Sequence, residues 1–393
     1  MHAPGHPRVL LLHNRYRLEG GEERSLALQQ QALTNAGVEH RLLERHSAQA
    51  RRVQAAAALL RGGAGEEEIA AAVRELGAGI AHVHNMQPLI GPRGLAAARD
   101  AGARVVLHLH NARLFCAIGV AARDGAPCFR CRGRNTLPGL ALNCRGSLPE
   151  AAVYAAGLAR HQPLALSAAD RFVAPSRWAA GQLARLGVPS ARMEVLPHYL
   201  PADELAAGSR AHDGRYALAA GRLSPEKGLD VAVEAAALAG VPLRIAGDGP
   251  AAAELAAQVR RLGAPVELLG HVSGAAVREL LAGAAVLVQS SRSHEFSPFS
   301  VLEAMGAGVP VAATRSGGVP ELVGDESCVP LGDARALAER LRALWSEPAR
   351  RREEGEALLA RVRERHSEAR YLGSLLGLYE RLVSDSSANT AAQ

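Results

Sequence analysis

Short β-type runs alternate with alanine- and leucine-rich helical patterns along almost the whole chain. This alternation is typical of parallel α/β units, in which a helix follows each strand and packs on the sheet. No short-period repeat is evident, so a solenoid is not expected. The expected strands of the first half are Arg8–His13, Val38–Glu44, Ile80–His84, Ala103–His110 and Arg171–Ser176, and those of the second half are Tyr216–Gly221, Val241–Gly247, Pro265–Gly270, Ala284–Ser290 and Val309–Thr314.

The length of 393 residues is too great for one ordinary hydrophobic core, so two domains are expected. A polar stretch that contains Pro and Gly, His198–Gly214, is the natural linker. We therefore predict an α/β fold of two doubly wound, Rossmann-like domains that face each other across a cleft. Such domains bind ligands beyond the carboxyl ends of their strands. The predicted parts are residues 1–200, residues 201–370, and a C-terminal helix end with a disordered tail over residues 371–393.

Charge and composition limit the class of partner. No apolar run approaches about 20 residues, and the N-terminus lacks the layout of a signal peptide, so a cytoplasmic location is expected. Aromatic residues make up only 3% of the chain and no recognition motif is evident, so nucleic acid is not an expected partner. Residues 1–200 hold 24 Arg and 14 acidic residues, or +10, and the remainder sums to −4. A basic first half suits a lipid-linked acceptor or an anionic membrane surface, such as the inner face of the plasma membrane. A solvated surface in an Arg-rich chain explains the charge equally well.

One cation is exceptional. Of the 45 cationic side chains, 44 are Arg, and Lys227 is the single Lys. A lone Lys in such a chain indicates a site that needs a compact ammonium rather than a planar guanidinium, with chance retention as the alternative. Lys227 and Arg222 lie in GRLSPEKG, directly after an expected strand. Two cations on such a loop, beside a helix N-terminus, can receive a diphosphate. Two solvated loop charges are the alternative.

The segment Ser293–Pro310, SHEFSPFSVLEAMGAGVP, carries two carboxylates, Glu295 and Glu303. Ser297 is the expected N-cap of a helix and Pro298 its first residue, which leaves Glu295 on the preceding loop. One carboxylate near sugar hydroxyls and another near a ribose would suit a sugar nucleotide. A glutamate in a helix's first turn and a solvated helical glutamate are the alternative.

Three further segments lie where a nucleotide could bind. The amides of Phe299 and Ser300 fall at the positive end of the predicted helix, which suits a phosphate. The turn GDGP, with Gly247 and Gly249, follows one strand, and GHV, with Val272, follows the next. A turn such as GDGP is not specific when taken alone, since any turn from a strand to a helix can have this form.

The motifs GRLSPEKG, GDGP, GHV, EFSPFSVLEAMGAGVPV and SGGVPELV, in this order, resemble those of the family-4 retaining glycosyltransferases of the GT-B fold. The first half agrees, because Gly20, Gly21 and Glu23 in LLHNRYRLEGGEERSLALQ match the GGxE pattern of the family. The resemblance covers roughly residues 8–370. It implies an enzyme that moves a sugar, with retention, from a nucleotide-diphosphate sugar to a lipid-linked or glycan acceptor. Relatives commonly build envelope or capsular polysaccharides.

The resemblance also implies roles for single residues. Arg222 and Lys227 would neutralise the donor diphosphate, so that no metal cofactor is required for catalysis. Glu295 would hold hydroxyls of the donor sugar, and Glu303 would hold the ribose. The members that would contact the donor from the first domain are Gly20 and Gly21, near the phosphates, and His110, near the reacting carbon.

The sequence departs from the family pattern at two positions. Pro298 stands where many relatives have Gly, and because Pro has no N–H, one donor to a phosphate is absent. His198 stands where relatives often have Asn.

Two groups of residues could hold a metal ion. Four cysteines, Cys116, Cys128, Cys131 and Cys144, fall in one insertion over residues 113–146, and a structural zinc site is our interpretation. Free thiols or a redox pair are the alternatives, and Cys328 is expected to serve packing. The pattern HxH places alternate side chains on one strand face, so that His82, His84 and His108 are a second group, but no carboxylate is spaced to complete a site.

Three other functions compete with sugar transfer. A sugar-nucleotide epimerase would need another acid/base set, and a dehydrogenase would need GxGxxG where the chain has HNRYRLEGGEE. A non-catalytic sugar-nucleotide-binding or scaffold protein could keep the fold. The presence of Arg222, Lys227 and Glu295 argues against that last function.

Overall fold

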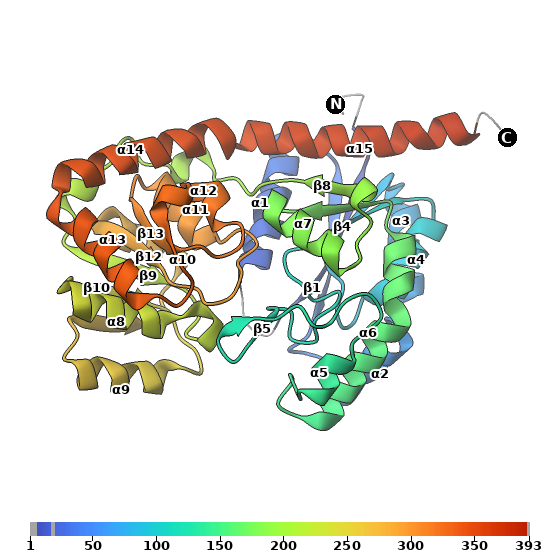
Figure 1. Ribbon diagram of the computed structural model, residues 1–393. Coiled ribbons are helices and arrows are strands. Elements are labelled where there is room, and N and C mark those ends of the chain that lie inside the picture. The colour runs from blue at the N-terminus through green and yellow to red at the C-terminus, as the bar shows by residue number, and fades with distance from the viewer. Residues whose placement is uncertain (1–5, 17–19, 391–393) are drawn as a thin grey trace. The chain divides into compact units, whose positions relative to one another are not determined.

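The structure, a computed structural model, describes residues 6–16 and 20–390 (Figure 1). The chain divides into two compact units, each with its own parallel sheet. Unit 1 comprises Met1–Ala121, Phe129–Pro197 and Ala369–Gln393, and unit 2 comprises Ala122–Cys128 and His198–Glu368. The predicted boundary at residue 200 falls close to the change of unit at His198.

Unit 1 contains a six-stranded sheet in the order β2-β1-β3-β4-β7-β8, and all of its paired strands are parallel. The central strands are almost entirely buried because helices cover both faces of a parallel sheet. The strands are β1 (Val9–Arg15), β2 (His40–His46), β3 (Ile80–Asn85), β4 (Arg104–His108), β7 (Arg171–Ala174) and β8 (Met193–Val195). The helices are α1 (Gly21–Asn35), α2 (Arg52–Arg61), α3 (Glu66–Leu76), α4 (Gly91–Asp100), α5 (Leu137–Ala141), α6 (Leu148–Ala168), α7 (Arg177–Leu186) and α15 (Glu368–Thr390), of which all but the first residue of α15 lies in this unit.

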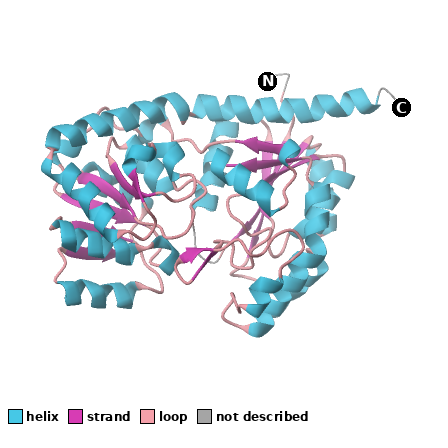
Figure 2. Cartoon of the chain, viewed as in Figure 1, coloured by secondary structure: helices cyan, strands magenta, loops and turns pink. Residues whose placement is uncertain are grey.

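Unit 2 contains the second six-stranded parallel sheet, in the order β11-β10-β9-β12-β13-β14. Figure 2 shows these strands between helices. The strands are β9 (Tyr216–Ala220), β10 (Leu243–Ala246), β11 (Val266–Gly270), β12 (Ala284–Gln289), β13 (Val311–Thr314) and β14 (Cys328–Val329), and a separate hairpin joins β5 (Ala122–Arg123) to β6 (Ala126–Pro127). The helices are α8 (Leu229–Ala239), α9 (Ala252–Leu262), α10 (Gly274–Ala282), α11 (Phe299–Gly306), α12 (Val319–Val323), α13 (Ala334–Ser346) and α14 (Pro348–Arg365).

The predicted α/β class with two parallel, doubly wound sheets is confirmed. The prediction missed the two short edge strands β8 and β14, because two or three residues are too few to show a period. It also extended β4 too far. The strand ends at His108, and the next amide, of Leu109, donates to the carbonyl of Val173 at 2.8 Å.

The helix end and disordered tail predicted over residues 371–393 fall on α15 and on residues 391–393, which lie outside the described residues. The helix α15 continues to Thr390, and the segment from Ala369 belongs to unit 1. Its apolar side chains recur every three or four residues, so one face of the helix is buried. Tyr371, Leu375 and Tyr379 on this face are at most 5% exposed. In the described part of the chain, no helix has the length and apolar character needed to cross a membrane.

Candidate active site

The single Lys of the chain contacts the first of the two predicted acids. Nζ of Lys227, on the loop after β9, donates to Oε1 of Glu295 at 2.7 Å. Both side chains remain partly accessible, at 30% for Lys227 and 15% for Glu295. This pair therefore places one compact cation directly beside one carboxylate before any ligand is bound.

Glu295 is held by several neighbours. Ser291 donates its hydroxyl to Oε1 at 2.6 Å, and Gln289 donates to that hydroxyl at 3.0 Å. The backbone is fixed as well, because the Glu295 amide donates to Oγ of Ser316 at 3.0 Å and its carbonyl accepts from the Gly318 amide at 2.8 Å. The motif SGGVPELV therefore positions the loop that carries Glu295.

Gly317 in this motif tolerates no side chain. Its φ is +57°, and a Cβ there would lie 2.2 Å from the carbonyl oxygen of Glu295. We expect Gly317→Ala to lower the free energy of unfolding by about 2 kcal/mol or more, since both backbone strain and a clash with backbone are introduced. Chemical denaturation measures this change.

The matched control is Gly274→Ala. Gly274 begins α10, and a Cβ at that position meets nothing within 4 Å. We expect the free energy of unfolding of Gly274→Ala to stay within about 0.5 kcal/mol of the parent value. An equal loss in the two variants would contradict the role given to Gly317.

The second predicted cation has a different partner. Arg222 donates from Nη2 to Oε1 of Glu226 at 2.5 Å, and Ser224 donates its hydroxyl to the same oxygen at 2.7 Å. Burial raises the pKa of Glu226, but the hydrogen bonds from Ser224 and Arg222 outweigh it, and the pKa is lowered. The Arg222 side chain is 47% exposed, so its guanidinium retains donors that face solvent.

The turn GDGP shapes the loop that carries both cations. The amide of Leu223 donates to the carbonyl of Asp248, and the amide of Ala251 donates back to the carbonyl of Leu223, both at 2.9 Å. A Cβ on Gly247 would lie 1.9 Å from the carbonyl oxygen of Gly221, and one on Gly249 would lie 2.4 Å from that of Leu223. The two glycines therefore allow close contact between the loops after β9 and β10.

The helix α11 begins one residue later than predicted. It runs over Phe299–Gly306, and Pro298, not Ser297, is the N-cap. Proline is confined to the first turn or the cap because it lacks an N–H, and here its extended φ and ψ place it just outside the helix. The amides of Phe299 and Ser300 thus lie at the helix start, as predicted.

His198 packs against the start of α11. Its ring stacks on Phe299 with centroids 4.4 Å apart, and burial lowers the pKa of His198 to about 3. The residue that replaces the usual Asn is therefore a neutral packing residue beside the helix N-terminus.

Glu303 lies further along α11 and lines a pocket of about 220 Å³. Arg278, Glu204 and Leu205 are also part of its lining. Val272, after β11, is half-buried. The roles predicted for Glu303 and Val272 remain predictions.

The predicted residues of the first half lie in unit 1. Gly20 precedes α1, where its amide donates to Oε2 of Glu23 at 2.8 Å, and Gly21 is the first residue of the helix. His110 follows β4, and its ring stacks on that of His108 with centroids 4.1 Å apart. Nε2 of His110 lies 3.0 Å from Nδ1 of His84.

A carboxyl group that sequence reasoning missed shares a small pocket with His110. Glu22 and His110 both line this pocket, of about 30 Å³. Asn111 and the hydroxyl of Tyr16 donate to Oε1 of Glu22. Burial of the carboxyl raises the pKa of Glu22 to about 8, against the opposing effect of Arg113. A carboxylic acid that is protonated near neutral pH is therefore present beside His110.

This raised pKa predicts a pH-dependent stability. Glu22 titrates at about 8 in the folded chain and at about 4.3 when unfolded. Between these values the folded state binds more protons, so this residue makes the free energy of unfolding fall as pH rises. Glu22→Gln removes that fall, and we expect it to raise Tm relative to the parent more at about pH 8.5 than at about pH 5. Thermal unfolding across this range measures the difference, and a constant difference would contradict the assignment.

The four cysteines of the insertion are all half-buried. Cys116, Cys131 and Cys144 belong to unit 1, whereas Cys128 belongs to the short segment assigned to unit 2. Within the described residues, the side chains found close enough together to hold an ion are those of His82, His84 and His108. The zinc site remains a prediction.

Comparison with known families decides the relationship. A model of "Glycosyltransferase Family 4" matches residues 19–204, and a model of "Glycosyl transferases group 1" matches residues 214–347. The two matches together span both units and contain nearly all of the predicted site. The chain belongs to the family-4 glycosyltransferases.

Curated members of related function match parts of this family-4 chain. Over 176 residues it is 36% identical to WcaL of Escherichia coli K12, a protein named for colanic acid biosynthesis as a glycosyltransferase, with 41% of each chain covered. It is 34% identical over 139 residues to a GDP-mannose-dependent alpha-(1-6)-phosphatidylinositol dimannoside mannosyltransferase of Mycobacterium tuberculosis, which covers 34% of this chain and 36% of that protein. The chain thus spans less than half the length of these relatives.

Solved structures match the family-4 chain over nearly its whole length. Anabaena HepE in complex with UDP and glucose matches with a TM-score of 0.67 and 17% identity, covering 94% of this chain and 98% of that one. Sucrose-phosphate synthase of Thermosynechococcus elongatus matches with a TM-score of 0.69 and 18% identity, covering 96% and 100%. At such identities the likeness shows the GT-B fold.

Sequence reasoning missed several supporting residues, and only some left a signal. Glu226 lies four residues after Arg222 inside the quoted motif, a spacing that could have indicated the ion pair. Ser291 and Ser316 left no signal, because a serine beside a loop carboxylate has no distinctive spacing.

Proposed function

We propose that this protein is a retaining glycosyltransferase that moves a sugar from a nucleotide-diphosphate sugar to an acceptor. The observation that carries this proposal is the contact between Lys227 and Glu295 in unit 2. The only Lys of the chain lies beside the first of the two acids that are spaced as in the family. UDP and glucose bound to HepE support a nucleotide-sugar donor.

In this proposal each side chain of the site has a separate role. The Lys227 ammonium and the Arg222 guanidinium stabilise the negative charge that develops on the departing diphosphate. Such stabilisation of developing charge is usually the largest catalytic contribution. Glu295, held by Ser291, accepts hydrogen bonds from hydroxyls of the donor sugar, and Glu303 accepts them from the ribose.

The remaining roles follow from the family. His110 contacts the donor sugar near the reacting carbon, and the backbone of Gly20 and Gly21 serves the phosphates. Gly247, Gly249 and Val272 support the nucleotide, and the amides at the start of α11 add positive potential near a phosphate. The proposal requires no metal cofactor for catalysis, because the two cations serve the diphosphate.

The donor is tested by thermal unfolding with UDP-, GDP- and ADP-sugars. A ligand that binds only the folded state raises the free energy of unfolding, by about 2.7 kcal/mol at a hundredfold excess over Kd, and therefore raises Tm. We expect one nucleotide class to raise Tm clearly more than the others. Equal Tm values with and without every donor would contradict the proposal.

Transfer must then be separated from mere binding. Release of nucleoside diphosphate in the presence of cell-envelope extract is expected for the transferase. A scaffold protein would bind the donor without release, and an epimerase would change the sugar without releasing diphosphate. The anomeric configuration of the product, read by NMR, tests retention.

The acceptor and the location are part of the same proposal. The first 200 residues carry a charge of +10, which suits a lipid-linked or glycan acceptor at an anionic membrane surface. WcaL is named for colanic acid biosynthesis, and the mannosyltransferase is named for a phosphatidylinositol dimannoside. We propose envelope or exopolysaccharide synthesis by a peripheral protein of the cytoplasmic face. Flotation with anionic vesicles tests the membrane contact.

We also retain a structural zinc at the four cysteines of the insertion as a proposal. Thiolates at such spacing suit tetrahedral zinc. Metal analysis of the purified protein is expected to give about one zinc per chain and clearly less in Cys131→Ser. The site would be contradicted if the purified protein contained no zinc and added zinc left its free energy of unfolding unchanged.

A further inference from the structure

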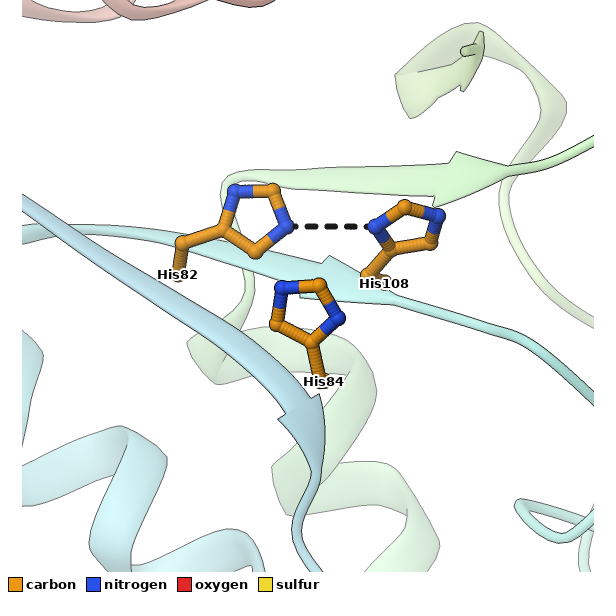
Figure 3. A group of neighbouring side chains, drawn as sticks. All are labelled: His82, His84 and His108. Carbon is orange, nitrogen blue, oxygen red and sulfur yellow. Dashed lines mark hydrogen bonds between the residues drawn. The ribbon is translucent and has the colours of Figure 1, made fainter. Parts of the chain in front are cut away.

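A buried network of hydrogen bonds in unit 1 joins two helices to two strands. At its centre lies Gln29 of α1, which is 0% exposed. Figure 3 shows three of its imidazole rings close together, with His82 directed at His108. The members are Gln29 of α1, Tyr371 and Tyr379 of α15, His82 and His84 of β3, His108 of β4, and His110 after it.

The first branch starts at the Gln29 carbonyl oxygen, which accepts two hydrogen bonds. The Tyr371 hydroxyl donates to Oε1 at 3.0 Å, and Nε2 of His84 lies 3.0 Å from the same oxygen. Because a carbonyl oxygen only accepts, His84 carries its proton on Nε2, and its Nδ1 is an acceptor. That Nδ1 lies 3.0 Å from Nε2 of His110. His110 therefore also carries a proton on Nε2.

The second branch starts at the Gln29 amide nitrogen, which donates to the Tyr379 hydroxyl at 2.9 Å. The hydroxyl proton of Tyr379 is then directed at Nδ1 of His82, 2.7 Å away. His82 in turn has its proton on Nε2, which lies 3.3 Å from Nδ1 of His108. Both branches thus take their direction from one amide.

Two groups of the second branch, His82 and Tyr379, are neutral. Burial lowers the pKa of His82 to about 3 and raises that of Tyr379 well above its ordinary value. A neutral imidazole has one donor and one acceptor nitrogen. With the Gln29 amide oriented as in the structure, the hydrogen bonds of both branches are consistent with one direction of donation.

A metal ion is the competing use of these rings. His82, His84 and His108 offer nitrogen atoms within 4.8 Å of one another. However, both nitrogens of His82 and both of His84 already lie at hydrogen-bond distance from polar neighbours. An ion would have to break these hydrogen bonds, so the contacts favour the hydrogen-bonded network.

We propose that Gln29 is a positioning residue, which holds His84 and, through it, His110 in the tautomer protonated on Nε2. Nδ1 of His110 is then fixed as a hydrogen-bond acceptor, suited to a hydroxyl of the donor and unsuited to an anionic oxygen. This last step rests on the proposed function, whereas the tautomers do not.

The tautomers are measured by long-range ¹H–¹⁵N correlation spectra of the histidine rings, which separate protonated from unprotonated nitrogens. In the parent protein we expect His84 and His110 to be protonated on Nε2. Gln29→Leu, of similar volume, removes the acceptor, and both rings are expected to become tautomer mixtures. Gln31→Leu, an exposed position on the same helix, is the matched control and should leave the spectra unchanged. If Gln29→Leu does not fold, Gln29→Met tests the same loss.

Tyr379→Phe tests the separation of the two branches. It removes the donor to His82, so the His82 signals should change, while His84 and His110 should stay protonated on Nε2. Protonation of His84 or His110 on Nδ1 in the parent, or unchanged tautomers in Gln29→Leu, would overturn the proposal. A stoichiometric shift of the His82, His84 and His108 signals by added zinc would overturn it in favour of a metal site.

Activity gives the second readout. We expect Gln29→Leu to lower kcat about tenfold or more, because a misplaced tautomer at a catalytic imidazole is costly, and Gln31→Leu to keep the parent rate. Wild-type kcat in Gln29→Leu despite mixed tautomers would contradict the link to catalysis. The parent protein could show the expected tautomers of His84 and His110 but transfer no sugar from any donor. That result would support the tautomers and contradict the proposed function.

Discussion

We expect Lys227→Ala to lower kcat about 100- to 1000-fold, the range observed when one preorganised donor to a developing negative charge is removed. The ammonium is the compact cation of the site and contacts Glu295 at 2.7 Å. Since Lys227 is 30% exposed, its removal should leave Tm close to the parent value. Release of nucleoside diphosphate at saturating donor measures the rate.

Lys227→Arg is the informative control, because it keeps the charge and changes only its shape. In a chain that uses Arg for every other cation, retention of Lys indicates that a planar guanidinium does not fit. We therefore expect Lys227→Arg to recover only a small part of the activity. Parent-like turnover in Lys227→Ala would show that Lys227 has no role in the mechanism. Parent-like turnover in Lys227→Arg would show that the site does not need the compact shape of the ammonium.

We expect Glu295→Ala to lower kcat/KM for the donor about 10- to 100-fold, because hydrogen bonds between a charged group and substrate hydroxyls would be lost. The carboxylate already accepts from Lys227 and Ser291, so its orientation is set before a donor arrives. Steady-state kinetics with the donor identified by thermal unfolding measure the change.

Glu295→Gln separates charge from shape. The amide oxygen can still accept from Ser291, but the ion pair with Lys227 is lost. An intermediate kcat/KM is expected, and circular dichroism should show the parent fold in both variants. Wild-type kcat/KM in Glu295→Ala would show that Glu295 does not contact the donor sugar.

The sequence predicted the charged residues of the site, but not the residues that hold them in place. Lys227 and Glu295 were predicted from residue type and motif, and the structure places them in contact because both follow the carboxyl ends of neighbouring parallel strands, β9 and β12. The hydrogen bond from Ser291 to the Glu295 carboxylate and the one from the Glu295 amide to Ser316 could not be predicted. They depend on the conformation of the loop after β12 and on its approach to the loop after β13, which the local pattern does not encode.

Tertiary packing explains the errors of the fold prediction. The strand predicted over Ala103–His110 ends at His108. This residue pairs with Val173, and the partner strand β7 ends one residue later, at Ala174. The C-terminal segment looks polar at its end, yet the stripe with Tyr371 and Tyr379 is buried in unit 1. The network around Gln29 joins residues more than 300 positions apart in the sequence, so no local pattern could reveal it.

The central claim is that unit 2 binds the diphosphate of a nucleotide through the ammonium group of Lys227. Calorimetric titration of the parent and of Lys227→Ala with the preferred nucleoside diphosphate, without sugar or acceptor, tests this claim most directly. The account predicts that the variant binds at least about tenfold more weakly, since a charge-assisted contact to phosphate is lost. Equal affinity of the two proteins would contradict it.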